Sequence, residues 1–101
     1  MQETTPRKTP HFLRNRDEWI RMVNLSPDVS HVTARVAVNL AMRMNIRTRD
    51  AWPSIDTIAK DIGASPRSVI SAIDQLVEEG FLGAERKRNK GNVYWLVFKW
   101  Q

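Results

Sequence analysis

Five polar side chains between residues 65 and 75 could hydrogen-bond to a nucleic acid. Arginine can bind guanine with two hydrogen bonds, whereas serine and glutamine can bond to base edges or to phosphates. Helical spacing predicts one exposed face carrying Ala72 together with several of these side chains, with Arg67 and Ser71 alongside, and Ala72 could then contact a thymine methyl group. The five candidates are Ser65, Arg67, Ser68, Ser71 and Gln75.

A basic segment follows at residues 85–90, where four cations oppose Glu85 and the net charge is +3. Flexible cations at a hairpin tip can bind phosphates or enter the minor groove. The candidates in this segment are Lys87, Arg88 and Lys90. Four further candidates for contacts with the nucleic-acid backbone precede residue 65, namely Arg47, Arg49, Ser54 and Thr57. Of these, Ser54 is expected first of all to cap a helix.

Two short helices must position these side chains. The first is expected from Ser54 to Gly63, with a serine cap at its start, a glycine stop at its end and an apolar stripe of Ile55, Ile58, Ala59 and Ile62. The second is capped by Ser65, has Pro66 at its first position and ends at Gly80, with a buried stripe of Val69, Ile73, Leu76 and Val77. Two helices joined by a tight turn predict a helix-turn-helix, whose second helix presents its N-terminal half to the major groove.

The remaining segments predict a winged helix-turn-helix with one extra N-terminal helix, a mainly α fold with a small β-hairpin. Residues 1–14 are expected to be a disordered basic arm and residues 15–101 the folded domain. Within the domain we expect a helix over 16–25 with Asn15 as its cap, and a helix from Ser26 or Ser30 to Met44 with a stripe of Val29, Val32, Val36, Leu40 and Met44. A short strand at 51–52, a strand over 81–86, a basic loop over 87–92 and a strand over 93–100 complete the order.

The last strand is apolar on both faces, which a two-stranded wing does not require. Its large side chains are Tyr94, Trp95, Leu96, Val97, Phe98 and Trp100. Either Trp19 and Ile20 of the first helix cover the second face, or a second copy of the chain does so in a homodimer. The sequence favours the homodimer slightly, because symmetric DNA sites match two-fold proteins.

Composition limits the other classes of function. The chain has 101 residues, a net charge of +5 and no cysteine, which fits one domain in a reducing cytoplasm and suggests a polyanionic partner. His11 and His31 are isolated, so no metal site or cofactor is expected. The sequence has no paired carboxylates and no phosphate loop, so neither an enzyme nor a small-molecule ligand is expected. Neither a signal peptide nor a membrane span is evident. Residues 54–80 carry a net charge of −3, which weighs against DNA binding. Three of their acids, Asp74, Glu78 and Glu79, fall in the C-terminal half of the second helix, which is expected to point away from the groove, and this weakens the objection.

Residues 39–82 resemble the winged-helix domain common in bacterial, phage and plasmid proteins. The family pattern pairs "AWPS" with "LA…GxSxRTVxxAixxLxxxGxL", matched here by AWPS at 51–54 and by IAKDIGASPRSVISAIDQLVEEGFL at 58–82. Departures are Pro66-Arg67-Ser68 and Ser71, where relatives are more basic. The resemblance implies a winged helix that binds double-stranded DNA in a sequence-specific manner. We expect a small transcriptional regulator acting at the nucleoid, because no replication domain is evident in the sequence. Alternatives are the origin-binding module of a replication initiator and, in another class, a protein-interaction winged helix.

Overall fold

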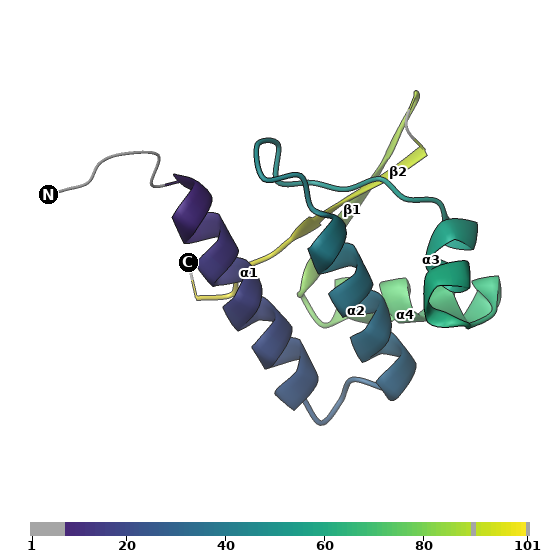
Figure 1. Cartoon of the computed structure of the whole chain (residues 1–101). Helices are drawn as coiled ribbons and strands as arrows, with labels where there is room; N and C mark the ends of the chain where they lie inside the picture. The colour runs from purple at the N-terminus through teal and green to yellow at the C-terminus, as the bar shows by residue number, and fades with distance from the viewer. Residues whose placement is uncertain (1–7, 90, 101) are drawn as a thin grey trace, which may run out of the picture.

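The computed structural model describes residues 8–89 and 91–100, with side chains from residue 11 onward. The elements in chain order are α1 (Lys8–Leu25), α2 (His31–Arg43), α3 (Ile55–Ile62), α4 (Pro66–Glu78), β1 (Leu82–Lys87) and β2 (Gly91–Leu96). Figure 1 shows α1 and α2 side by side, with α3 and α4 beyond α2 and the hairpin rising above the helices. Mainly helical with one hairpin, the fold is that of a winged helix-turn-helix.

Serine side chains begin three of the helices, as the sequence predicts. The hydroxyl oxygens of Ser30, Ser54 and Ser65 each accept a hydrogen bond of 3.1 Å from the backbone N–H three residues later. Pro66 occupies the first turn of α4. Gly63 ends α3 with φ of 68°, a left-handed conformation that glycine adopts at little cost.

The hairpin pairs antiparallel from Leu82 opposite Leu96 to Lys87 opposite Gly91. Ala51 adds an isolated bridge to Tyr94 through two backbone hydrogen bonds of 2.8 and 2.9 Å. The predicted short strand is therefore present at Ala51. The predicted strand over 93–100 is wrong in its bounds, because β2 lies at 91–96 and residues 97–100 leave the ladder.

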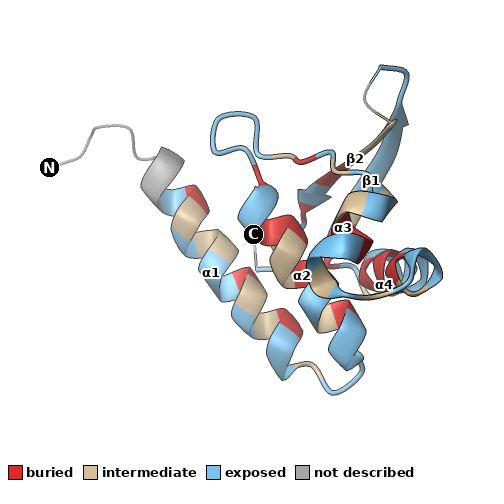
Figure 2. Ribbon diagram, turned by 45° about the vertical axis from the view of Figure 1, so that its right-hand side comes forward, coloured by how far each residue is buried: buried red, intermediate tan, exposed pale blue. Residues whose placement is uncertain are grey.

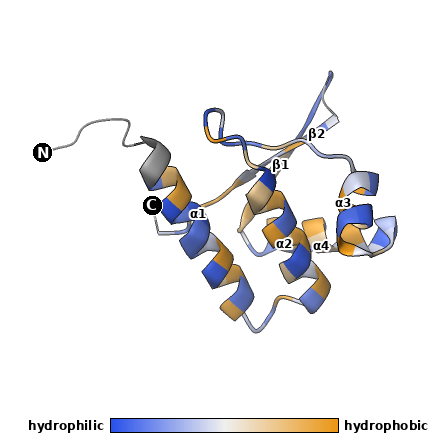
Figure 3. Cartoon of the chain, in the orientation of Figure 1, coloured by the Kyte–Doolittle hydropathy of each residue, from blue (hydrophilic) through white to orange (hydrophobic). Residues whose placement is uncertain are grey.

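The core lies where α2, α3 and α4 meet the base of the hairpin (Figure 2), and orange apolar positions follow the same inner faces in Figure 3. Two predicted core positions are wrong: the side chains of Val32 and Val77 are 39% and 43% exposed. Thr33 and Ala72 are buried in their helices instead. Because threonine is polar and alanine is small, hydrophobicity alone does not predict that these two positions are buried. Each predicted stripe is therefore rotated around its helix relative to the observed one.

The N-terminal prediction also needs correction. The first helix begins at Lys8, so residues 8–14 are helical rather than part of a disordered arm, and Asn15 lies inside the helix instead of capping it. Phe12 is buried and its ring lies 6.0 Å from the ring of Phe98, which gives this segment a tertiary contact that its polar composition did not suggest. Residues 1–7 lie outside the described residues.

Helix α1 packs against the residues that flank the base of the hairpin. The indole N–H of the fully buried Trp19 donates a 2.8 Å hydrogen bond to the Phe81 carbonyl, and its ring meets the Phe81 ring edge-on. Ile20 packs beside it, partly buried. The first helix thus covers only the base of this face, because Trp95 and Trp100 stay 38% and 41% exposed.

Trp95 lies directly over the backbone of its cross-strand partner Gly83, where a Cβ would overlap the indole ring. We therefore expect Gly83→Ala to destabilise the protein by about 1–3 kcal/mol, because the indole must move off the strand. Urea unfolding measures this change. In a Trp95→Ala background the same substitution should cost much less. An equal cost in both backgrounds would show that the close approach of the indole does not require glycine.

Candidate nucleic-acid interface

Helix α4 presents one polar row to solvent. Its buried side chains are Val69, Ala72, Ile73 and Leu76. At about 100° per residue, the opposite side of the helix carries four exposed side chains, here called the outward row. The outward row consists of Arg67, Ser71, Asp74 and Glu78.

The side of α4 that faces α2 is already engaged within the protein. The Gln75 amide donates a 2.7 Å hydrogen bond to the Asp28 carbonyl, and its oxygen accepts from the Ser30 N–H at 3.4 Å. Ala72 is 2% exposed, so it cannot offer its methyl group to a thymine. Ser68 lies partly buried on the same side, 3.0 Å from the Ser65 hydroxyl. The predicted face through Ala72 and Gln75 is therefore wrong, and Gln75 leaves the candidate surface.

The other side of α4 borders a groove of about 670 Å³ that separates it from the hairpin, here called the wing groove. Ile70 and Val77 of α4 line one wall, and Ala84 and Tyr94 of the hairpin line the other. Ile70 is 49% exposed and lies outside the buried side of α4. Helix α4 and the hairpin thus form one continuous surface.

The hairpin cations divide between its two faces and its tip. Arg86 pairs across the strands with Asn92 and lines the wing groove, so it is a candidate that the sequence reasoning did not select. The Lys87 ammonium lies 3.5 Å from the Glu85 carboxylate on the opposite face. Arg88 is exposed in the turn, and Lys90 lies outside the described residues. Because successive side chains of a strand point to opposite faces, the sequence could have predicted that Arg86 lies on the face opposite to Lys87.

The loop that carries Arg47 and Arg49 lies away from this surface. Figures 1 and 2 both place it on the side of the hairpin near α1. The Arg49 guanidinium lies 5.6 Å from the centre of the Phe12 ring, a cation–π contact with α1. The Asn45 side chain accepts hydrogen bonds from two N–H groups of the loop and fixes its shape. We therefore leave Arg47 and Arg49 out of the proposed surface.

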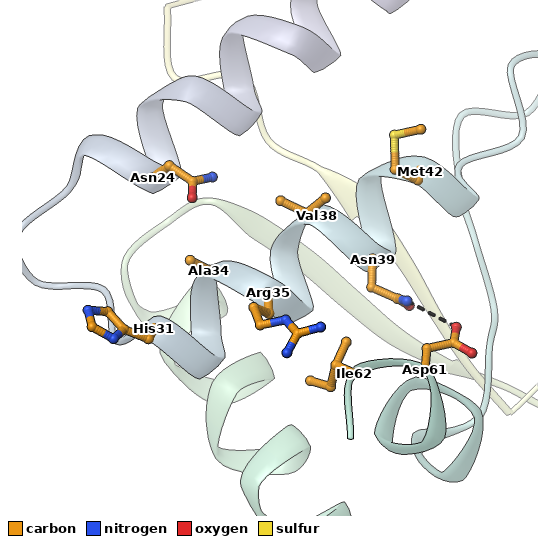
Figure 4. A pocket seen from close by; sticks show the side chains of 9 residues that line it. All are labelled: Asn24, His31, Ala34, Arg35, Val38, Asn39, Met42, Asp61 and Ile62. Atoms are coloured by element: carbon orange, nitrogen blue, oxygen red, sulfur yellow. Dashed lines mark hydrogen bonds between the residues drawn. The ribbon is translucent and has the colours of Figure 1, made fainter. Parts of the chain in front are cut away.

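Helix α3 supports α4 and is tied to α2 by ionic contacts. Asp61 of α3 accepts from the Asn39 amide at 3.0 Å and pairs with the Arg43 guanidinium. These contacts, first with Asn39 and then with Arg43, hold the pKa of Asp61 below its usual value of 3.8. Their contribution to stability is therefore present above pH 3.8 and is lost as the pH falls through the lower folded-state pKa. Figure 4 shows Asn39 and Asp61 beside Arg35 in a hollow of about 550 Å³ between α1, α2 and α3.

At the start of α3, Ser54 is exposed and Thr57 is partly buried, with their hydroxyls 2.9 Å apart. Trp52, shortly before α3, is 42% exposed. His11 and His31 are exposed, and no group of three potential metal ligands occurs among the described side chains. None of the described helices is long and apolar enough to cross a bilayer.

Comparison with known families agrees with this geometry. Residues 33–82 match a family model described as a helix-turn-helix domain. The match begins inside α2, includes α3 and α4, and ends at the first residue of β1. No curated protein matches the chain. Residues 33–82 therefore form a helix-turn-helix domain and belong to that family.

Proposed function

We propose that this protein binds double-stranded DNA in a sequence-specific manner. The observation that carries the proposal is the exposed amino end of α4, where Ser65, Pro66 and Arg67 are all open to solvent. In a helix-turn-helix this end of the second helix enters the major groove. Arg67 and Ser71 then face the base edges from the outward row.

Phosphates would be held on either side of that helix. Arg86 lines the wing groove, Arg88 is exposed in the hairpin turn, and Lys60 is exposed on α3. Ser54 exposes its hydroxyl at the amino end of α3, where free N–H groups and the helix dipole favour a phosphate. Among the acids of residues 54–80, Asp61 does not add negative charge to this surface, because it is paired with Arg43 on the α2 side.

In the cell the protein would act at the nucleoid in the cytoplasm without catalysing a reaction, by occupying its site or recruiting other proteins. Regulation of transcription is the use we favour, since a compact helix-turn-helix can block or recruit polymerase by binding alone. An origin-binding role in a phage or plasmid replication initiator is the alternative.

Arg67→Ala tests the assignment of the recognition helix. We expect it to weaken binding to the preferred duplex by about 1–3 kcal/mol and to relax the preference at one base pair, because arginine binds guanine through two hydrogen bonds. Selection from random duplexes supplies the preferred sequence, and fluorescence anisotropy measures the affinity. Arg35→Ala is the matched control, since Arg35 lies in the hollow between α1, α2 and α3. A uniform loss on every sequence would make Arg67 a phosphate contact instead.

The same selection reports on pairing of two copies. Trp95, Val97 and Trp100 remain 36–41% exposed. We propose that a second copy covers them, which would give a homodimer through α1 and the end of the chain. A palindromic preferred sequence and a dimer mass in sedimentation would support this pairing, whereas a single half-site bound by a monomer would contradict it.

A further inference from the structure

Two exposed acids of the outward row, Asp74 and Glu78, have no role in the interface described so far. Asp74 is the one nearer to Arg67, and it lines the wing groove beside Ile70. Among the described residues it has no hydrogen-bond or ion-pair partner. Although Asp74 belongs to the C-terminal half of α4, it shares the outward face with Arg67, where an unpaired carboxylate would be repelled by phosphate.

The charges around Asp74 limit which part of DNA can lie over it. Arg67 lies toward the amino end of the same row, and Arg86 lies on the far wall of the wing groove. Glu78 and Glu85 also line this groove, so its carboxylates outnumber its cations and phosphates are kept away from Asp74. The groups that can approach Asp74 at low electrostatic cost are therefore base edges that carry a hydrogen-bond donor.

A carboxylate only accepts hydrogen bonds, and the major groove offers it amino groups on two bases. Adenine places its acceptor N7 next to the N6 amino group, so a carboxylate there meets a repelling lone pair. Cytosine offers its N4 amino group without an acceptor on the same base edge. We propose that Asp74 accepts a hydrogen bond from a cytosine N4 amino group and thereby selects one C·G pair, an inference that rests on the proposed DNA binding.

The helix sets the spacing of this contact. Asp74 follows Arg67 by two turns, about 10 Å along the axis. With about 3.4 Å between base pairs, the cytosine lies no more than about three base pairs from the guanine bound by Arg67. Ile70 lies between them in sequence, with an exposed apolar side chain that can contact a thymine methyl group.

The test compares Asp74→Asn and Asp74→Ala with the native protein by selection from random duplexes. We expect Asp74→Asn to move the preference at one position from C·G toward A·T, because an amide can bond both N6 and N7 of adenine. Asp74→Ala should reduce the native preference at that position on the order of tenfold, with the other positions unchanged. Glu78→Gln is the matched control, because it removes the same charge one turn farther along the outward row.

The outcomes separate this inference from the function on which it rests. If Asp74→Asn strengthens binding to all sequences alike, as Glu78→Gln is expected to do, Asp74 only repels phosphate and the inference fails while DNA binding stands. If the native protein binds no duplex with preference, the proposed function itself fails. A loss of folding is distinguished by the circular dichroism spectrum of each variant.

Discussion

Raising the salt concentration from about 50 to about 200 mM is expected to weaken duplex binding by roughly 250- to 1,000-fold. Neutralising about 4 to 6 phosphates releases their counterions, which gives a slope near −4 to −5 when log K is plotted against log salt. The exposed cations that supply this term come from α3, α4 and the hairpin, including Lys60, Arg67 and Arg88. Anisotropy titrations at four or five salt concentrations measure the slope.

The same titration separates DNA binding from the rival class of function. A winged helix that binds protein through its acidic helices and its aromatic C-terminal segment would show no comparable slope on duplex DNA. An Arg86→Ala, Arg88→Ala double variant should reduce the slope by about 2 if both side chains bind phosphates. A slope unchanged by that variant would remove the hairpin from the interface, even if α4 still bound DNA.

Local signals in the sequence were sufficient for most of the fold. Serine caps, Pro66 and the left-handed Gly63 are decided by the backbone around each residue, so the bounds of α3 and α4 could be predicted closely. The start of α1 could not be predicted in this way. Its N-terminal turns include Phe12, whose burial against Phe98 depends on a contact 86 residues distant in the chain.

The candidate surface was predicted less well than the fold, because it depends on the rotation of α4. Placing Val77 rather than Ala72 in the buried stripe turned the helix toward α2 and selected Gln75, which is bound to the segment before α2. Spacing of i, i+3, i+4 and i+7 from Val69 gives the observed buried set. With that buried set, Ile70 and Asp74 are predicted to lie on the exposed side of α4. Arg49 was misplaced for a different reason, since only the fold shows that its loop lies beside α1.

Trp19→Ala is expected to destabilise the protein by about 3–5 kcal/mol, a large part of the roughly 5–15 kcal/mol that holds a domain of this size. The fully buried indole joins α1 to Phe81 at the base of the hairpin, through both ring packing and a hydrogen bond. Trp19→Phe keeps most of the packing and should cost less, because the Phe81 carbonyl still accepts from the Val97 N–H at 2.9 Å.

Helix α1 lies outside the segment that matches the helix-turn-helix family. Urea unfolding of these variants therefore also tests whether α1 unfolds together with the rest of the domain. Leu25→Ala is the control, because that side chain of α1 is 70% exposed and should contribute little. If Trp19→Ala costs no more than Leu25→Ala, α1 is an appendage to an independently stable domain. A large cost with a single cooperative transition would mean that α1 helps to hold the hairpin in place beside α4, and so takes part in building the surface proposed to bind DNA.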